Sequence, residues 1–593
     1  MKLSDYIAGF LASRSIRHAF VMSGGASLHL IHSVAKTPGI DFVCAQHEQA
    51  CAMAADAYAR VAGVPGVAMA TSGPGATNLI TGICCAYYDS IPMICITGQV
   101  ATFRMSGDTG VRQLGFQETN IVDVCRSITK YVVQIADPMD IRYELEKAYW
   151  MATSGRPGPV LVDVPDNLQR SEVEVEKLRG FEPPPSGTSD VPAAEIERVA
   201  ELLKGSERPI LVLGTGVRAA GAIAESLRLA ESCGLPVLPT WGALDFLPSD
   251  HPLMVGTFGT HGSRNGNYAV QNADLVLSIG SRLDTHCVGS PFSSFARGAR
   301  KVMVDIDPAE IAKFERHQMV IDVKLPFDAG AVLRGLLDKV EPKALPDWAP
   351  WRARIDAWKR AYPTGGRRTP REGSVDPYGF MRSLAAAARA DDIVVSDTGC
   401  GLAWACQAFA FKAGQRFFHA FNNTPMGYGL AGAIGATIAS GRRVLCLTGD
   451  GGLMINIQEL ATVARHALPI KVVLFNNHGH GMIQQTQDQW LGSEYLASSV
   501  EGGLAFPDFL KVAESYGIPS RHIGANDQVE AVLAEALASD GPMLIELEVA
   551  AAERVIPQVK FGRPIEDQEP LLPREEFLAN MIVEPMPASL TID

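Results

Sequence analysis

Residues 442–477, RRVLCLTGDGGLMINIQELATVARHALPIKVVLFNN, decide the fold because they read as a strand, a helix and a second strand. The short apolar runs at 442–450 and 469–477 have the length of buried strands, and 455–468 reads as the helix between them. A strand, a helix and a strand at this spacing require the two strands to pair in parallel. The stretch therefore predicts a doubly wound α/β sheet.

The same alternation occurs in two other parts of the chain. The segments are 64–73, 77–89 and 92–99 in the first part, and 209–216, 220–234 and 235–240 in the second. We therefore expect three α/β domains, each with a doubly wound parallel sheet. Ligands of such sheets bind at the carboxyl ends of the strands.

The length of the chain and its Pro- and Gly-rich stretches indicate the domain boundaries. At about 150 residues per domain, 593 residues are too many for one core. The expected order is a first domain (1–176), a linker (177–194), a middle domain (195–340), a linker that begins as an aromatic and basic helix (341–375), a third domain (376–555) and a C-terminal arm (556–593). The arm contains FGRPIEDQEPLLPREEF, which is too rich in Pro and acidic residues for regular structure, so we expect it to pack in an extended form.

Composition excludes several classes of protein. Hydrophobic residues make up 47% and charged residues 20%, which is a globular balance rather than a disordered one. The net charge is −13 and no basic block is present, so nucleic acid is not an expected partner. No run reaches the ~18 apolar residues of a membrane span. Because the eleven Cys form no CxxC pair and most lie in apolar runs, we expect a reducing, cytoplasmic location.

The amino terminus does not have the pattern of a signal peptide. Charged residues interrupt its apolar stretch, and Leu3, Ile7, Phe10 and Leu11 instead form one face of a helix.

Two polar motifs follow neighbouring strands of the quoted stretch. Gly449-Asp450-Gly451 follows the first strand and Asn476-Asn477 closes the second, with 24 residues between the motifs. Asp450 offers a carboxylate, Asn477 an amide oxygen and Gly479 a backbone carbonyl, which are ligands that suit Mg²⁺. The glycines beside Asp450 let the backbone approach a phosphate. The pair of motifs therefore predicts a magnesium and diphosphate site.

This pair resembles the cofactor signature of the thiamine diphosphate enzyme family. Glu48, which follows a strand and starts an Ala-rich helix, matches the glutamate that hydrogen-bonds the aminopyrimidine ring in that family. A plain helix-start carboxylate would also explain it. Within the family the chain is most similar to acetohydroxyacid (acetolactate) synthases, over nearly its whole length. The segments that carry this similarity are 23–34, 71–83, 90–100, 116–130, 156–165, 306–313, 424–436 and 449–460.

The resemblance assigns a set of residues to the thiamine site. Met426 falls where the synthases place a large apolar residue under the thiazolium, although a core Met is the plain alternative. The implied catalytic residues are Glu48, Gln117 and Gly25. The implied cofactor contacts are Gly24, Pro74, Asn78, Gly399, Met426, Gly449, Asp450, Gly451, Gly452, Asn477, Gly479, Gly481 and Met482.

The middle segment carries the synthase pattern for FAD, whose role in the synthases is structural. The implied contacts are Gly214, Thr215, Gly216, Gly259, Thr260, His261, Gly280, Arg282, Asp305 and Asp307. The segment has no GxGxxG motif and no acidic residue at the distance that NAD-binding domains require, so it lacks the NAD-binding fingerprint. A salt bridge is the alternative explanation for Arg282.

This chain differs from the synthases at two positions that bind the acceptor substrate in those enzymes. Thr486 stands where the synthases carry a bulky Trp, and His286 stands where they carry an Arg that pairs with the acceptor's carboxylate. A neutral His cannot make a bidentate bond to a carboxylate. Lys130 is assigned to the same acceptor pocket. A different acceptor is therefore expected, unless compensation elsewhere or a gap in the alignment explains the change.

Three functions remain open. The first is a decarboxylating carboligase that joins a pyruvate-like donor to an acceptor larger than a second 2-oxo acid, such as an aldehyde, a ketone or a nucleotide-linked keto sugar. The others are an orthodox acetolactate synthase and a flavin-dependent pyruvate oxidase. The presence of Glu48, Asp450 and Asn477 argues against a non-catalytic homologue. In this family the first and third domains meet across a subunit interface, so a homodimer or a dimer of dimers is implied.

Overall fold

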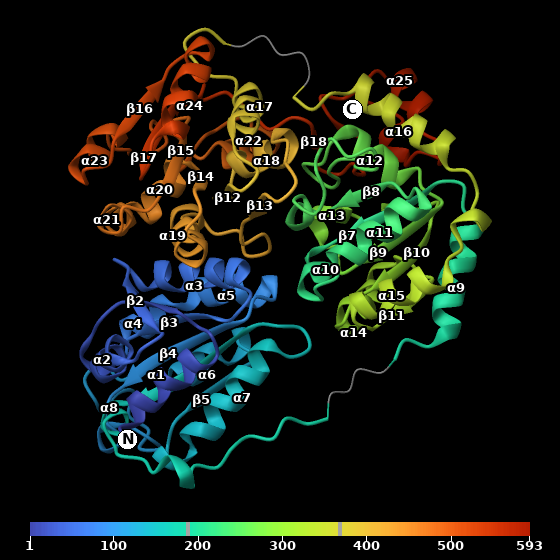
Figure 1. Ribbon diagram of the computed structural model, residues 1–593. Helices are drawn as coiled ribbons and strands as arrows, with labels where there is room; N and C mark the ends of the chain where they lie inside the picture. The colour runs from blue at the N-terminus through green and yellow to red at the C-terminus, as the bar shows by residue number, and fades with distance from the viewer. Residues whose placement is uncertain (186–189, 366–370, 593) are drawn as a thin grey trace.

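The computed structural model describes residues 1–185, 190–365 and 371–592. Parts of both predicted linkers (186–189 and 366–370) and residue 593 lie outside these ranges. Within the described residues the chain forms three parallel-sheet α/β domains (Figure 1). The N-terminal domain lies below the C-terminal domain in this view, and the middle domain lies beside them. None of the described helices is long and apolar enough to cross a membrane.

The three sheets have the expected doubly wound topology. The N-terminal sheet has the order β2-β1-β3-β4-β6-β5, the middle sheet β11-β10-β9-β7-β8 and the C-terminal sheet β13-β12-β14-β15-β17-β16. In the N-terminal sheet the strands are β1 (His18–Val21), β2 (Asp41–Cys44), β3 (Gly66–Ala70), β4 (Met93–Gln99), β5 (Tyr131–Gln134) and β6 (Pro159–Pro165). In the middle sheet they are β7 (Pro209–Leu213), β8 (Val237–Pro239), β9 (Leu275–Ile279), β10 (Arg300–Val304) and β11 (Val323–Leu325). In the C-terminal sheet they are β12 (Ile393–Ser396), β13 (Arg416–Phe418), β14 (Val444–Gly449), β15 (Ile470–Asn476), β16 (Ser520–Ile523) and β17 (Met543–Glu548).

Each sheet reverses its winding between two neighbouring strands. These pairs are β1 and β3, β7 and β9, and β12 and β14. A reversal leaves a crevice beyond the carboxyl ends of the two strands, and ligands of doubly wound sheets bind there. The glycine-rich segments singled out in the sequence follow these strands.

Helices cover both faces of the sheets. The helices that matter for the site are α3 (Glu48–Ala62), α4 (Pro74–Asn78), α5 (Ile80–Asp89), α10 (Thr215–Ala219), α13 (Thr285–Val288), α18 (Cys400–Ala408), α19 (Tyr428–Ser440), α20 (Asp450–Ile455), α21 (Leu460–Arg465) and α22 (Gly481–Trp490). On the outer faces lie α1 (Leu3–Ser13), α2 (Leu28–Lys36), α7 (Ile141–Thr153), α9 (Ala193–Lys204), α11 (Ile223–Cys233), α15 (Ala329–Lys339), α17 (Pro377–Ala387), α23 (Phe509–Ser515) and α24 (Val529–Ala538). In α1, Leu3, Ile7, Phe10 and Leu11 are all buried, as the helical face predicts.

The single helix expected over 455–468 is wrong. The chain instead forms α20, a short 3₁₀ turn and α21. Asn456 interrupts the helix because its side-chain amide donates to the carbonyl of Gly427 at 2.8 Å. The interruption ties α20 to the loop before α19.

Helix α3 packs directly against α19, which joins the N-terminal and C-terminal domains (Figure 1). The two helices approach closely: a Cβ added at Gly435 would lie 2.0 Å from the carbonyl oxygen of Ala54. Tyr428 donates its hydroxyl to the buried Asp56 across the same interface.

Charged side chains join all three domains near this interface. In the N-terminal domain, Arg60 pairs with Asp89 at 2.7 Å. In the middle domain, Asp245 pairs with Arg218 at 2.6 Å and with Arg416 of the C-terminal domain at 2.7 Å. Arg416 also donates to the backbone carbonyl of Arg60 at 2.9 Å. We call these five residues the charge junction.

The C-terminal arm does have regular structure, which corrects the expectation of an extended segment. It contains β18 (Gln558–Val559), β19 (Gln568–Glu569) and α25 (Arg574–Asn580). It returns to the middle domain, beside α12 (Arg264–Gln271) and α16 (Ala349–Ala361) (Figure 1). Arg264 donates to the carbonyl of Gln568 at 3.2 Å, and the amide of Asn267 donates to that of Ile565 at 2.7 Å. The arm therefore satisfies buried polar groups that the middle domain cannot satisfy alone.

The aromatic and basic helix expected at the start of the second linker is present as α16. Trp348, Trp351 and Trp358 are buried, and Trp358 donates to the side-chain oxygen of Asn580 on α25 at 2.8 Å. The helix therefore packs between the middle domain and the arm.

Candidate cofactor site

Asp450 lies at the carboxyl end of β14, at the start of α20, and is almost fully buried. Its carboxylate accepts hydrogen bonds from the backbone N–H of Gly451 at 2.6 Å and of Gly479 at 3.0 Å. Burial raises the pKa of the Asp450 carboxyl to about 6, so the group is still an anion at neutral pH. Asp450 and Gly479, which follow two neighbouring strands, are therefore in direct contact, as the spacing predicts.

The loops around Asp450 leave no room for side chains. A Cβ added at Gly451 would lie 2.6 Å from the His480 ring and 2.9 Å from the Met426 methyl group. A Cβ added at Gly481 would lie 2.6 Å from the side-chain nitrogen of Asn477. The structure thus brings Met426 together with the loops that follow β14 and β15.

Asp397, which sequence reasoning missed, fixes the loop that carries Met426. It follows β12 and is buried, and its carboxylate accepts from the backbone N–H of Thr398 at 2.8 Å and of Gly427 at 3.0 Å. It also accepts from Gly429 N–H at 3.3 Å. Burial raises the pKa of its carboxyl to about 6. An Asp that closely follows the apolar run 393–395 and precedes Gly399 was the available signal.

Three further glycines that were predicted as cofactor contacts lie at this edge of the sheet. Gly399 caps α18 with φ +93°, a conformation that favours Gly, and a Cβ there would meet nothing within 4 Å. Gly449 ends β14, and a Cβ added at Gly452 would lie 2.8 Å from the carboxylate of Asp397. At these glycines the crevice between β12 and β14 is bordered by backbone.

Glu48 starts α3 and is mostly buried. The amide of Asn78, at the end of α4, donates to its carboxylate at 2.9 Å. Pro74 is the first residue of α4, and Gly24 packs so closely on Thr71 that a Cβ would lie 2.5 Å away. These contacts all lie within the N-terminal domain, at the crevice between β1 and β3.

Gln117 and Gly25 lie at the same crevice. Gln117 has φ +62°, and its carbonyl oxygen would lie 2.8 Å from a Cβ added at Gly73, just before Pro74. Gly25 begins a 3₁₀ turn after β1, with no atom within 4 Å of an added Cβ. The Gln117 side chain is exposed, as is the neighbouring Phe116 at 86%.

A cavity of about 550 Å³ lies at the crevice between β7 and β9 and reaches the C-terminal domain. Three groups of residues line it. They include Gly214, Thr215, Trp241, His261, Gly280, Arg282 and His286 from the middle domain; Thr398, Gly399, Thr424 and Met482 from the C-terminal domain; and Tyr88 and Asp89 from the N-terminal domain. The cavity therefore joins the predicted flavin contacts to the edge that holds Gly399 and Met482.

Other predicted flavin contacts support the cavity from outside its lining. Gly216 N–H donates to the carbonyl of Gly280 at 2.9 Å, and Thr260 N–H donates to that of His286 at 2.8 Å. Gly259, with φ +100°, precedes Thr260 in this loop. These residues hold the shape of the cavity.

Arg282 and Asp307 take part in salt bridges, whereas Asp305 accepts a backbone hydrogen bond. Arg282 lines the cavity and also pairs with Glu310 at 2.7 Å. Asp307 pairs with Arg156 at 2.9 Å, and Asp305 accepts from the N–H of Asp307 at 2.9 Å. Neither aspartate is among the residues that line the cavity.

Comparison with known proteins places the chain in a family. Residues 1–124, 196–336 and 397–547 match the N-terminal TPP binding domain, the central domain and the C-terminal TPP binding domain of thiamine pyrophosphate enzymes. The chain belongs to the thiamine pyrophosphate enzyme family.

Three relatives of this thiamine pyrophosphate enzyme illustrate the similarity. Acetolactate synthase 1, chloroplastic, of Zea mays is 36% identical over 579 residues, which cover 95% of this chain and 88% of the relative. The probable acetolactate synthase large subunit of Methanocaldococcus jannaschii is 35% identical, with 95% and 94% covered. Acetolactate synthase isozyme 2 large subunit of Escherichia coli is 33% identical, with 95% and 98% covered.

The C-terminal crevice of this thiamine pyrophosphate enzyme fits a diphosphate with Mg²⁺. The described residues contain no cluster of three or more His, Cys, Asp or Glu side chains that would hold a metal alone. A cation beside Asp450 would therefore need amide or backbone oxygens, from Asn477 and Gly479, and diphosphate oxygens. The open space beside Gly399 and the absence of side chains at Gly451 match that need.

The middle cavity fits a flavin. The indole N–H of Trp241 is buried and has no hydrogen-bond partner, so an acceptor on a ligand would satisfy it. Trp241 packs on His286 with ring centroids 4.3 Å apart, and Nε2 of His286 lies 3.1 Å from Nδ1 of His261. Burial lowers the pKa of His261 to about 3 and also lowers that of His286, so both rings are neutral. A planar, uncharged ring is the group that such a wall accommodates.

Two of the three predicted acceptor residues lie near the cavity. His286 lines it, and Thr486 lies one helical turn after Met482 on α22, with its hydroxyl donating to the carbonyl of Met482 at 3.2 Å. Lys130 does not reach this region in the single chain. It precedes β5, at the opposite edge of the N-terminal sheet from Glu48, and donates to the carbonyl of Ser154 at 2.7 Å.

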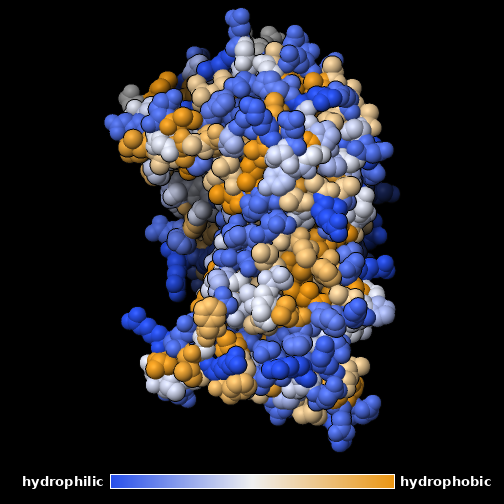
Figure 2. All heavy atoms as spheres, turned by 90° about the vertical axis from the view of Figure 1, so that its left-hand side faces the viewer, coloured by the Kyte–Doolittle hydropathy of each residue, from blue (hydrophilic) through white to orange (hydrophobic). Residues whose placement is uncertain are grey.

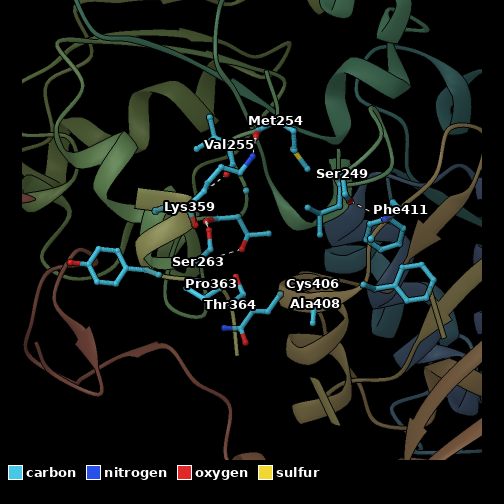
Figure 3. Close-up of a pocket in the computed structure, with 18 residues that line it drawn as sticks. Ser249, Met254, Val255, Ser263, Lys359, Pro363, Thr364, Cys406, Ala408 and Phe411 are labelled. Carbon is cyan, nitrogen blue, oxygen red and sulfur yellow. Dashed lines mark hydrogen bonds between the residues drawn. The ribbon is translucent and has the colours of Figure 1, made fainter. Parts of the chain in front are cut away.

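A smaller cavity, about 240 Å³, lies behind the loop that contains Gly259, Thr260 and His261, between the middle and C-terminal domains (Figure 3). The Lys359 ammonium donates to the carbonyl of Met254 at 2.6 Å, and Ser263 donates to the carbonyl of Thr257 at 2.9 Å. Cys406 and Phe411 close the other side (Figure 3). These contacts brace the loop that leads to His261.

Proposed function

We propose that this enzyme decarboxylates a pyruvate-like 2-oxo acid and joins the remaining two-carbon unit to a carbonyl acceptor. The observation that carries the proposal is the contact between the loops of Asp450, Gly479 and Met426 at the crevice between β12 and β14. Formation of acetolactate from two pyruvates is the candidate that the relatives favour, because relatives named acetolactate synthases match 95% of the chain.

The reaction balances without an oxidant. One pyruvate loses its C1–C2 bond and releases CO₂, a new C–C bond forms at the acceptor carbonyl, and one proton is taken up. Thiamine diphosphate, when bound, accepts the electron pair that the departing CO₂ leaves behind. Glu48 would hydrogen-bond the pyrimidine ring and hold a proton there, Asp450 and Asn477 would hold Mg²⁺, and Met426 would support the thiazolium ring. FAD in the middle cavity would have a structural role.

The direct test is turnover of pyruvate alone, with thiamine diphosphate, Mg²⁺ and FAD. Acetolactate and an equal amount of CO₂ are the expected products of the first candidate. Oxygen consumption with acetyl or acetate products would instead support a flavin-dependent oxidase and contradict the proposal.

The metal site has its own test. Asp450→Ala should abolish Mg²⁺-dependent retention of thiamine diphosphate, because it removes the carboxylate that is proposed to hold the metal. The matched control is Asp391→Ala, an exposed carboxylate of the same domain, which should retain the cofactor. Calorimetry of both variants with cofactor and Mg²⁺ measures the difference. Normal retention by Asp450→Ala would contradict the assigned role.

A second candidate is a carboligase for a larger acceptor that has no carboxylate. This candidate is supported by Thr486 and His286, which lie near the cavity. Thr486 has a hydroxyl where the synthase resemblance implies an indole, and His286 has a neutral ring where it implies a guanidinium. A screen of aldehydes, ketones and keto sugars with pyruvate, read by mass for a gained acetyl unit, separates the candidates. Synthase-like rates of acetolactate formation without any added acceptor would rule this candidate out.

We also propose a homodimer or a dimer of such dimers, in which a second copy completes the thiamine site. The contacts of Glu48 lie in its own domain, and the loop beside Gln117 exposes the large apolar side chains of Phe103, Leu114 and Phe116. Hydrophobic patches also interrupt the face that carries α2, α21 and α23 (Figure 2). A second copy would cover such surfaces. Full activity of a monomer at assay concentration, measured by sedimentation, would contradict this assembly.

A further inference from the structure

A chain of hydrogen bonds leads from the main cavity into the C-terminal domain. The hydroxyls of Thr398 and Thr424, which both line the cavity, lie 2.7 Å apart. Nε2 of His419 lies 3.1 Å from the Thr424 hydroxyl, and Nδ1 of His419 lies 2.9 Å from the carbonyl oxygen of Ser396. We call these three side chains the hydroxyl relay.

The direction of every bond in the hydroxyl relay is fixed by its buried end. His419 is fully buried, and burial lowers its pKa to about 4, so the ring is neutral and carries a single N–H. The Ser396 carbonyl can only accept, which places that N–H on Nδ1 and leaves Nε2 as an acceptor. Thr424 must therefore donate to His419, and Thr398 must donate to Thr424.

These hydrogen-bond directions determine what Thr398 can bind in the cavity. Because the hydrogen of the Thr398 hydroxyl is used by Thr424, Thr398 presents only lone pairs to the cavity. A ligand group that meets it must donate a hydrogen bond, as a hydroxyl or an N–H does. A carboxylate or keto oxygen at the same place would face another acceptor, which costs binding free energy.

We infer that Thr398 is a specificity-determining residue that selects an acceptor substrate with a hydroxyl group beside its carbonyl. The inference rests on the proposed function and deepens its second candidate, since Thr398 shares the cavity with Gly399, Met482 and His286. The substrate class is therefore the hydroxy-aldehydes and hydroxy-ketones, which include sugars.

The experiment compares glycolaldehyde with propanal as acceptors for pyruvate. The two aldehydes have the same number of non-hydrogen atoms, and a hydroxyl in one replaces a methyl group in the other. The wild-type holoenzyme should favour glycolaldehyde in kcat/KM. Thr398→Val should lower the glycolaldehyde-to-propanal ratio by roughly 2- to 12-fold, the range that corresponds to the loss of one net hydrogen bond. Thr398→Ser, which keeps the hydroxyl, should keep the ratio.

Two further variants separate hydrogen-bond direction from shape. Thr424→Val leaves Thr398 intact but frees its hydrogen to turn into the cavity, so the preference for glycolaldehyde should weaken. Thr437→Val is the matched control, because this buried hydroxyl donates only to the Ala433 carbonyl within α19. Its ratio should equal that of the wild type.

The outcomes distinguish failure of the inference from failure of the proposed function. If the wild type releases no CO₂ from pyruvate with any acceptor, the proposed function is wrong. If coupling occurs but Thr398→Val and Thr424→Val leave the ratio unchanged, only the inference is overturned. A change in flavin affinity without a change in the ratio would also overturn it, because the relay would then serve FAD.

Discussion

Glu48 and Asp450 are the two carboxylates assigned to cofactor chemistry, and their surroundings differ. Glu48 receives a hydrogen bond from the Asn78 side chain, whereas Asp450 receives two from backbone N–H groups. A side-chain amide leaves the rest of the Glu48 carboxylate for another partner. Backbone donors hold Asp450 rigidly in a position suited to a metal ion.

Replacement of Glu48 by Gln tests its proposed role in proton transfer. The variant should still bind thiamine diphosphate, because the Asp450 site is untouched. Exchange of the thiazolium C2 proton should slow by about 10²-fold or more, the usual contribution of a positioned acid or base. Hydrogen–deuterium exchange of bound cofactor, followed by NMR, measures the rate. An unchanged rate would remove Glu48 from the proton-transfer role.

Asp397 predicts a pH dependence of stability. Its pKa is raised in the folded chain from 3.8 to about 6, so the folded state takes up this proton at higher pH than the unfolded state does. Its contribution to the free energy of unfolding therefore grows as pH falls, by about 1 kcal/mol between pH 7.5 and 5. Asp397→Asn lacks this titration.

The corresponding measurement is the Tm of wild type and Asp397→Asn, both without cofactor, at pH 7.5 and pH 5. The difference should move in favour of the wild type at pH 5. A difference that is independent of pH would show that the Asp397 carboxyl does not titrate in this range.

The sequence indicates candidate residues whose signal is local, and it does not indicate residues whose partners are distant. Gly449, Asp450 and Asn477 stand at strand ends in a recognisable spacing. Asp397 acts on Gly427, 30 residues away in sequence, and nothing in its neighbourhood announces that contact. The hydroxyl relay depends in the same way on how β12 and the loop after β13 meet.

At the scale of elements, α22 connects the cavity to the exposed surface. Met482 lines the cavity, and Thr486 lies one turn later on the exposed face. Side chains four residues apart on a helix lie on the same face, so a larger group at 486 would extend over Met482.

The double variant Thr486→Trp with His286→Arg should therefore favour pyruvate as acceptor. The indole would fill space, and the guanidinium would add charge-assisted bonds to a carboxylate, at about 1.5–3 kcal/mol each. The ratio of acetolactate to aldehyde-derived product should rise by roughly one to two decades. Competition assays analysed by mass spectrometry measure it. No rise in the ratio would remove these two positions from acceptor choice.

Element types were predicted better than element ends. Apolar runs and crossover lengths identified the central strands, because burial on both faces leaves a strong pattern. The break at Asn456 and the helix α25 were not predicted, because both depend on tertiary partners. Asn456 bonds across to Gly427, and α25 gains its stability from α12 and α16.

At the scale of the whole molecule, the arm completes the middle domain. Removal of residues 556–593 should expose Trp358 and leave Arg264, Asn267 and Asn272 without their partners in the arm. Each unsatisfied buried group costs about 1–3 kcal/mol, so the truncated chain should be strongly destabilised. Calorimetry should show a clearly lower Tm and loss of bound FAD. A Tm equal to that of the full chain would contradict the role of the arm.

The charge junction limits how such a chain can be recombined with its relatives. The linkers suggest natural breakpoints, and a middle domain taken from a relative would keep its own sheet and its internal contacts. A donor domain with a neutral residue at position 245 would, however, leave Arg416 of the recipient mostly buried and without its carboxylate, which is a costly state. The three domains are therefore separate folding patterns but not interchangeable modules, and a hybrid must inherit both sides of this contact together.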